Sequence, residues 1–232
     1  MQLYGICRRD IGDGPTVYAH LYASASPARR ARAERCRHPE DAWRCLLAEA
    51  LLRRGLADAG CPAAADGEVT VATGAYGKPH IVGCPDFHYN LSHGGDWVVL
   101  AWDGSPVGVD VEPVDGTRNV RALAARYFSA DEQAYMEVAA SAVDAAERFY
   151  ALWTAKEAYL KYVGTGLGQG MTTPPVVTDG CIGDGVYLSR RRLPDGHWLA
   201  VCGAQPLRHT VWLTAEDLTA KSLVREQNKQ GR

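Results

Sequence analysis

Two acidic side chains interrupt the apolar stretch VGVDVEPV at residues 107–114. Residues two apart in a strand point to the same face, so we expect Asp110 and Glu112 to project together. Two like charges on one face repel unless a divalent cation or a lysine lies between them. The spacing therefore leaves two interpretations open: an edge strand with both acids in water, or a strand that supplies oxygen ligands to Mg²⁺.

A second set of candidate residues falls within FYALWTAKEAYLKYVGTGL, residues 149–167. On a helix, Trp153, Glu157 and Lys161 lie along one face at intervals of four residues. An exposed Glu–Lys pair of this kind contributes only about 0.3–0.5 kcal/mol, but the flanking leucines and alanines predict a well-buried helix. Its acid and lysine would then face the two acids of the strand. Lys156 points about 100° away from Glu157 and is expected to be structural or to face a partner protein.

Two loop segments carry a third set, YGKPHI at 76–81 and NLSHGG at 90–95. Lys78, Ser92 and His93 lie in these segments among glycines, whose backbone amides can approach an anion closely. Backbone amides combined with lysine and histidine are typical of a phosphate cradle. The segments therefore predict contacts to a phosphorylated molecule.

Two other kinds of site fit less well. A zinc site would draw on His80, Cys84, His88 and His93. Their spacing matches no standard zinc motif, and proline and glycine interrupt it. The glycine-rich stretch GTGLGQG at 164–170 follows a predicted helix rather than a strand, which is the wrong context for a nucleotide-binding loop. Gly164 is better interpreted as a helix cap.

Helices and strands are expected to alternate around these sets of residues. Helix signals are Ser26-Pro27, a restart at Pro39 running to Gly60, a capping box from Ser129 to Glu132, and a helix over roughly 144–163. Strands are expected at 1–6, 68–72, 97–103, 106–114, 185–193, 197–204 and 209–215. The two-residue turn Gly104-Ser105 between 97–103 and 106–114 predicts that these strands form a hairpin.

The order of these elements indicates an α+β fold in two parts. After Pro113 the alternating strand pattern gives way to helix signals. This change predicts an N-terminal half at 1–113 and a C-terminal half at 114–232. The strand that carries Asp110 and Glu112 would be the last element of the first half. Glu157 and Lys161 would approach them from the second half, so the site is expected at the junction.

Composition narrows the class of protein. With 47% hydrophobic and 22% charged residues and a net charge of −2, the chain gives no argument for binding nucleic acid or a membrane. It lacks an apolar run of the ~20 residues that a transmembrane helix needs. The first ten residues do not resemble a signal peptide. Seven cysteines without a CxxC motif are expected to be reduced thiols, and the protein is expected to be cytoplasmic.

Taken together, VGVDVE and WTAKEAYLKYVGTGL resemble the paired signature of the Sfp-type 4′-phosphopantetheinyl transferases. HPEDAWRCLLAEALLR, YGKPHI and FHYNLSHGGDWVV also resemble that family and follow its order, so the resemblance spans most of the chain. It implies two similar α/β halves related by a pseudo-twofold axis. It also implies the activity of a holo-acyl-carrier-protein synthase, which moves phosphopantetheine from coenzyme A to a serine of acyl or peptidyl carrier proteins and releases 3′,5′-ADP.

The resemblance implies a role for each candidate residue. Asp110, Glu112 and Glu157 would hold Mg²⁺, for which Mn²⁺ may substitute, on the pyrophosphate. Lys161 would neutralise and protonate the leaving phosphate, and Glu157 is also a candidate base for the carrier serine. Contacts to coenzyme A would come from Arg29, Arg32, Arg44, Cys45, Lys78, Ser92, His93 and Lys161. Arg29 and Arg32 stand where the family has basic residues for the 3′-phosphate.

Partners and alternatives follow from the same reasoning. Carrier proteins usually present an acidic helix, so a basic or apolar groove is expected near the junction. Tyr127 and Phe128 are candidates for it, although a hydrophobic staple explains Phe128 equally well. A monomer that serves polyketide and nonribosomal peptide biosynthesis is expected. The alternatives are another Mg²⁺-dependent phosphate enzyme, of the pyrophosphatase or nuclease type, and a non-catalytic binding module.

Overall fold

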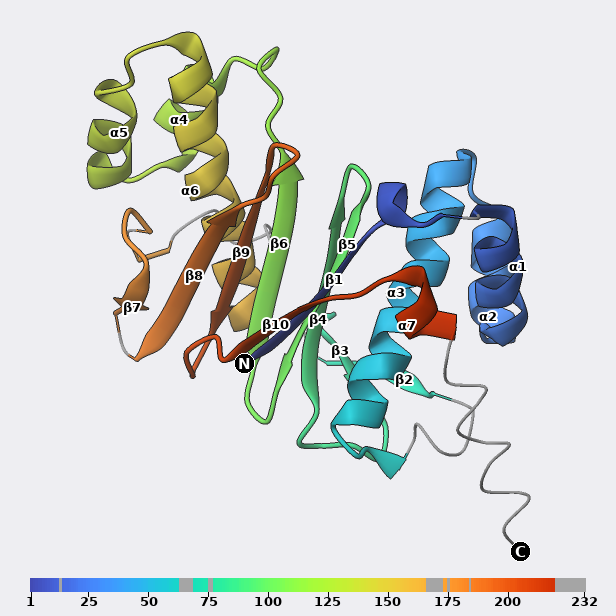
Figure 1. The fold of residues 1–232 in the computed structure, drawn as a ribbon. Coiled ribbons are helices and arrows are strands. Elements are labelled where there is room, and N and C mark those ends of the chain that lie inside the picture. The colour runs from blue at the N-terminus through green and yellow to red at the C-terminus, as the bar shows by residue number, and fades with distance from the viewer. Residues whose placement is uncertain are drawn as a thin grey trace, which may run out of the picture.

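The computed structural model describes residues 1–12, 14–62, 69–74, 77–165, 173–174, 176–183 and 185–219. Within these residues the chain forms two four-stranded sheets and one two-stranded sheet, with helices on the outer faces of the large sheets (Figure 1). Residues 166–170, part of the stretch considered above as a nucleotide loop, lie outside them. No described helix is long and apolar enough to cross a membrane. The predicted α+β class is confirmed.

The first large sheet has the strand order β10-β1-β5-β4. Its strands are β1 (Gln2–Cys7), β4 (His88–Gly94), β5 (Trp97–Asp103) and β10 (His209–Trp212). Its outer face packs against α3 (Pro39–Asp58), and α1 (Gly14–Ser24) and α2 (Pro27–Glu34) pack against α3. The predicted start of α2 is confirmed, because the Ser26 side chain accepts a hydrogen bond from the Arg29 amide, with proline in the first turn.

The second large sheet has the order β6-β9-β8-β7. Its strands are β6 (Val107–Pro113), β7 (Gly180–Ile182), β8 (Val186–Arg192) and β9 (His197–Gly203). Its outer face packs against α6 (Ala142–Val163), and α4 (Val120–Tyr127) and α5 (Ala130–Glu137) pack against α6. The capping box of α5 is confirmed, and Gly164 ends α6 with φ 84°, a conformation that favours glycine.

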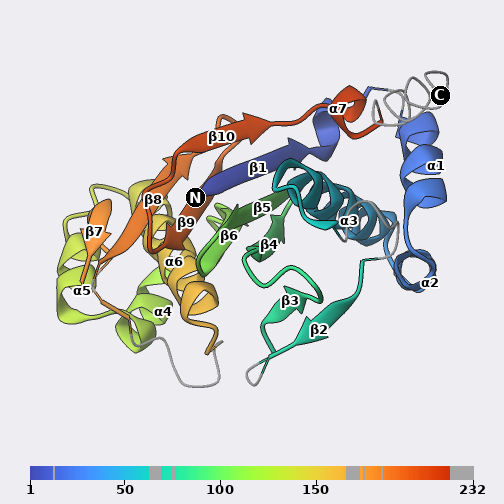
Figure 2. The ribbon, with the colours of Figure 1, turned by 90° about the horizontal axis from the view of Figure 1, so that it is seen from below.

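A shared apolar core lies between the inner faces of the two sheets. Val107, Val109 and Val111 of β6 pack there with side chains of β1, β5 and β9 such as Val99 and Val201. Because side chains alternate along a strand, Gly108, Asp110 and Glu112 of β6 lie on the other face, against α6. β6 also runs beside β4 of the first sheet (Figures 1 and 2).

The predicted hairpin between 97–103 and 106–114 is wrong. β5 pairs with β1 and β4, whereas β6 pairs along its whole length with β9. Both edges of β5 are therefore occupied within the first sheet, and β6 needs a partner elsewhere. Local alternation identifies strands, but it does not identify their partners.

The chain changes sheet at residues 104–106, and β10 returns to the first sheet, so the predicted boundary at 113 does not coincide with the change of sheet.

The two large sheets are built from the same order of elements. In each, a first strand (β1 or β6) is followed by three helices and an antiparallel pair (β4–β5 or β8–β9) whose last strand lies beside the first. The small sheet, β2 (Val71–Thr73) with β3 (Pro79–Ile81), is inserted before β4. The short 3-10 helix Arg8–Asp10 follows β1, and α7 (Ala215–Thr219) follows β10. The pseudo-twofold relation between the halves stays a prediction.

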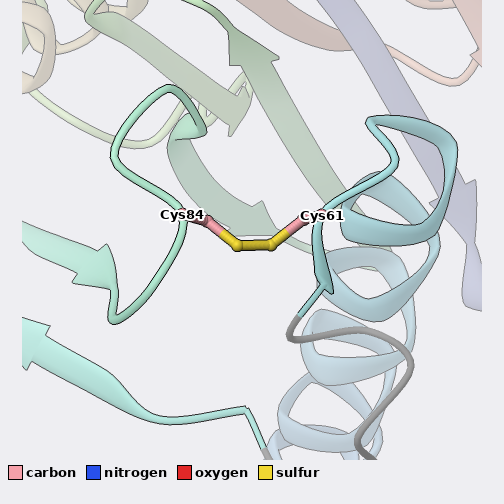
Figure 3. Close-up of a disulfide and its surroundings, with 2 residues drawn as sticks. All are labelled: Cys61 and Cys84. Carbon is pink, nitrogen blue, oxygen red and sulfur yellow. A yellow bond between two sulfur atoms is a disulfide. The ribbon is translucent and has the colours of Figure 1, made fainter.

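A disulfide joins Cys61, just after α3, to Cys84, in the turn before β4 (Figure 3). The expectation that all seven cysteines are reduced is therefore wrong for this pair. The two Cα atoms lie 6.1 Å apart although 23 positions separate them in sequence. The spacing of the cysteines along the sequence does not predict that the two residues meet, because their approach depends on how the chain returns from α3 to β4. Cys7, Cys36, Cys45, Cys181 and Cys202 are free thiols.

Candidate functional site

Asp110 lies at the centre of a cluster formed by β4, β6 and α6. It is only 3% exposed. Its Oδ1 accepts hydrogen bonds from the Ser92 hydroxyl at 2.8 Å and from the Lys161 ammonium at 2.6 Å. The Lys161 ammonium also lies 3.1 Å from the Ser92 Oγ. Three predicted site residues from three separate elements therefore meet at one carboxylate.

Glycine allows α6 to approach β6 closely enough for this contact. A Cβ atom on Gly108 would lie 2.0 Å from the carbonyl oxygen of Ala158 and 2.4 Å from the amide nitrogen of Tyr162, so only glycine fits. On the other side, the side-chain oxygen of Asn90 accepts a hydrogen bond from the Val109 amide at 2.9 Å and ties β4 to β6. Sequence reasoning missed both residues, although both lie inside the motifs that it singled out.

The other two acids lie in the same electrostatic field. Burial, reinforced by the negative charge of Asp110, raises the pKa of Glu112 to about 7, while Lys161 opposes the shift. Burial and Asp110 also raise the pKa of Glu157. The predicted approach of the strand acids to the acid and lysine of the helix is thus present. The cation that contacts Asp110 is Lys161.

Asp110, Glu112 and Glu157 form the candidate donor set for a divalent cation. Within the described residues, no group of three or more His, Cys, Asp or Glu side chains is assembled as a metal site. The chemistry nevertheless fits Mg²⁺, which prefers carboxylate oxygens and retains several waters. Asp110 Oδ2 is buried without a hydrogen-bond partner in the described part of the chain, and burial, followed by the charge of Asp110, raises the pKa of both Glu112 and Glu157.

Positively charged groups surround His93 at the end of β4. The Arg44 Nε donates to the carbonyl oxygen of Gly95 at 2.9 Å, and its guanidinium also pairs with Asp41 at 2.6 Å. Loss of hydration, followed by the charges of Arg44 and Lys161, lowers the pKa of His93. The structure therefore brings two predicted coenzyme A contacts, Arg44 and His93, to the side of the cluster occupied by Lys161.

Arg29 and Cys45 meet between α2 and α3. The Arg29 guanidinium lies 3.8 Å from the Cys45 Sγ, and its Nε lies 3.3 Å from a carboxylate oxygen of Glu49. Arg32, one turn further along α2, is exposed. Arg32, together with Arg29 paired to Glu49, supplies positive charge on the helical side of the first sheet. Their contact with coenzyme A stays a prediction.

Lys78, which the sequence predicted to contact coenzyme A, instead contacts backbone carbonyl groups. Its ammonium donates to three backbone carbonyl oxygens, those of Val107 at 3.0 Å, Lys161 at 2.8 Å and Tyr162 at 2.9 Å. Burial lowers the pKa of this ammonium to about 8. An ammonium has three protons, and all three are used here. The predicted contact to coenzyme A would require at least one of these bonds to be released.

Two expectations about flanking residues can be compared with the structure. Lys156 is 1% exposed and pairs with Glu132 at 2.9 Å, so its structural interpretation is confirmed. Phe128 is buried and stacks on Phe149, which agrees with a core role. Tyr127 is only partly buried and packs edge-on against Trp153. A carrier-protein contact at Tyr127 stays a prediction.

Comparisons with known proteins identify the family that the chain resembles. Residues 106–202, which contain Asp110, Glu157 and Lys161, match the model of the 4′-phosphopantetheinyl transferase superfamily. The chain is 35% identical over 215 residues to the 4′-phosphopantetheinyl transferase psf-1 of Bacillus pumilus, covering 83% of this chain and 85% of that protein. It is 34% identical over 224 residues to a 4′-phosphopantetheinyl transferase of Bacillus subtilis, covering 89% and 93%. It is 33% identical over 192 residues to the 4′-phosphopantetheinyl transferase Sfp of Bacillus subtilis strain 168, covering 78% and 83%.

Proposed function

The chain belongs to the 4′-phosphopantetheinyl transferase superfamily, and from this premise we propose that it modifies acyl and peptidyl carrier proteins. In the proposed reaction, a serine oxygen of the carrier forms a bond to the phosphorus that bears pantetheine in coenzyme A. The bond from that phosphorus to the bridging oxygen breaks, and 3′,5′-ADP leaves. The serine proton passes to a base.

The observation that supports this proposal most directly is the contact of Ser92, Asp110 and Lys161 where β4, β6 and α6 meet. Phosphoryl transfer depends mainly on alignment and on neutralising charge. Lys161 places an ammonium beside the groups expected to receive the pyrophosphate, and the Ser92 hydroxyl holds Asp110 by donating to it. Arg44 and His93 extend this donor surface, and Arg29, Arg32 and Cys45 are proposed to contact other parts of coenzyme A.

Asp110, Glu112 and Glu157 are the proposed ligands of Mg²⁺, or of Mn²⁺ in its place. When bound, the cation would neutralise charge on both phosphates and help to align them. Glu157 is the proposed base for the carrier serine. Burial raises its pKa, and a carboxylate with a raised pKa accepts a proton more readily near neutral pH. Lys161 is the proposed donor of a proton to the leaving phosphate.

The test is to incubate the protein with coenzyme A, Mg²⁺ and a panel of apo carrier proteins, and to follow the carriers by intact mass. A gain of one phosphopantetheine on any carrier, with release of 3′,5′-ADP, is the expected result. Asp110→Asn, which keeps the shape of the side chain and removes its charge, should abolish the gain. Hydrolysis of coenzyme A or pyrophosphate without carrier modification would instead support a different phosphate enzyme.

The choice among carrier proteins is tested by the same panel. We infer that the protein acts broadly on acyl and peptidyl carriers, including those of polyketide and nonribosomal peptide biosynthesis. Modification of a single carrier class would contradict that breadth.

A monomeric state and a cytoplasmic location are further proposals, and light scattering of the purified protein tests the first.

A further inference from the structure

We propose that Lys78 is a positioning residue, which joins the last turn of α6 to the start of β6 and so holds Lys161 in place at Asp110. This inference rests on the proposed function for its effect on turnover, but not for its structural part. Lys78 directly precedes β3 of the small sheet, whereas β6 belongs to the second large sheet and α6 packs on it. The side chain therefore reaches from the small hairpin into the frame of the reaction site.

The Lys78 ammonium lies at the C-terminal end of α6, where backbone carbonyl groups require hydrogen-bond donors. The last four carbonyl groups of a helix have no partner within the helix, and they form the negative end of its dipole. The Gly164 amide bonds to the carbonyl oxygen of Leu160 at 2.8 Å, which satisfies one of them. The Lys78 ammonium bonds to the next two, those of Lys161 and Tyr162. Lys78 thus acts as a cationic cap supplied by a distant segment.

The stem of Lys78 contributes to the same cap. A Cβ atom on Gly164 would lie 3.3 Å from the Lys78 Cδ, which shows that the aliphatic stem packs against the left-handed turn that ends α6. The stem and the ammonium therefore contact the same helix end. This arrangement orders the last turn by both packing and hydrogen bonding.

The third bond of the ammonium connects the helix to the strand. It reaches the carbonyl oxygen of Val107, the first residue of β6 and three positions before Asp110. The same ammonium also bonds to the carbonyl oxygen of Lys161, whose side chain donates to Asp110 at 2.6 Å. One cation thus links the backbone carbonyl of Lys161 to the start of the strand that carries Asp110.

This arrangement predicts how the loss of Lys78 affects turnover. Without the ammonium, two carbonyl groups of α6 and one of β6 lose their shared donor, and the last turn of α6 gains freedom. The Lys161 ammonium would then sample positions away from Asp110 and the leaving phosphate. A displacement of about 1 Å in a reacting group can lower the rate roughly 100-fold. A direct ligand of coenzyme A would instead affect mainly the affinity for coenzyme A.

The experiment compares Lys78→Met, which keeps most of the stem, with Lys78→Arg and with the matched control His80→Ala on the exposed face of the same hairpin. We measure kcat and KM for coenzyme A at saturating carrier and Mg²⁺. Lys78→Met should lower kcat by about 10–100-fold with KM nearly unchanged. Lys78→Arg should not restore kcat, because a planar guanidinium cannot replace a compact ammonium among three carbonyls. A large rise in KM with kcat retained would overturn the proposal.

Two further measurements separate this role from general damage. In the double variant Lys78→Met/Lys161→Met, the loss in kcat should equal that of Lys161→Met alone, since Lys78 acts through Lys161. Multiplied losses would contradict that link. Hydrogen exchange of peptides from the last turn of α6 should accelerate in Lys78→Met and not in His80→Ala. This exchange needs no turnover, so unchanged exchange would refute the cap even if the proposed activity were absent.

Discussion

Lys161 on α6 donates a 2.6 Å hydrogen bond to Asp110 on β6, so that a buried carboxylate and the proposed proton donor form one ion pair. The pair crosses from a helix to the strand on which it packs, and Ser92 completes it from the other large sheet. Asp110 is almost fully buried, whereas the Lys161 side chain is 29% exposed. Asp110 is thus enclosed by protein, while part of the Lys161 side chain remains accessible to solvent.

The first prediction concerns the chemical identity of residue 161. Lys161→Arg should retain the positive charge and the affinity for coenzyme A, but it should lower turnover by about 100-fold or more. An arginine does not release its proton in a protein, so it cannot serve as a proton donor. Steady-state kinetics combined with calorimetric titration of coenzyme A would measure both effects. Wild-type turnover in Lys161→Arg would exclude the role as proton donor.

The second prediction concerns the close packing of α6 on β6. Gly108→Ala places a methyl group against the backbone of Ala158 and Tyr162 and should lower the free energy of unfolding by about 1–3 kcal/mol. It should also lower turnover, because α6 must shift away from Asp110. Urea denaturation and carrier modification measure the two effects.

Gly104→Ala provides the matched control, because a Cβ atom there would have no neighbour within 4 Å. Its stability and turnover should stay close to those of the wild type. Equal effects of the two substitutions would show that glycine at position 108 is not required by helix packing.

Local sequence rules predicted which candidate residues share a face of a strand or helix, but they did not predict how the strands pair. Asp110 and Glu112 share a face because strand geometry has a period of two, and Glu157 and Lys161 share a face because helix geometry repeats near four. Both rules are local, so they could be applied to single segments. The partner of β6, by contrast, is β9, some 90 positions away, and nothing within VGVDVEPV encodes that choice.

Long-range contacts explain the other differences. Lys78 was assigned by its motif to coenzyme A, but its three acceptors are backbone carbonyls, which carry no residue-specific signal. The Cys61–Cys84 disulfide depends on how the chain returns from α3 to β4. In both cases the determining geometry arises only after distant segments have packed together.

The third prediction is a pH dependence of stability at Glu112. Its pKa is raised from 4.5 to about 7 in the folded protein. Between these values the unfolded chain has lost a proton that the folded protein still holds, so the stability contributed by the protonated group falls as pH rises. Without divalent cations, Glu112→Gln should therefore gain stability relative to the wild type from about pH 4.5 to about pH 7. Urea denaturation of both proteins across this range measures the difference.

Adding Mg²⁺ should reverse that trend, because the cation binds the ionised carboxylate. The stabilisation of the wild type by Mg²⁺ should be larger at about pH 8 than at about pH 5.5, and smaller in Glu112→Gln at both. Parallel stability curves for the two proteins would contradict the raised pKa. A Mg²⁺ effect that is independent of both pH and Glu112 would contradict its proposed role as a ligand.

The fourth prediction concerns the disulfide that closes the segment carrying Lys78. A cross-link restricts the unfolded chain, so Cys61→Ser/Cys84→Ser should lower the free energy of unfolding by about 2–4 kcal/mol. Cys181→Ser, which changes an exposed free thiol, is the matched control and should have little effect. Urea denaturation under non-reducing conditions measures both. A dithiol reductant should destabilise the wild type but not the double variant, and equal sensitivity of the two would show that this disulfide does not stabilise the fold.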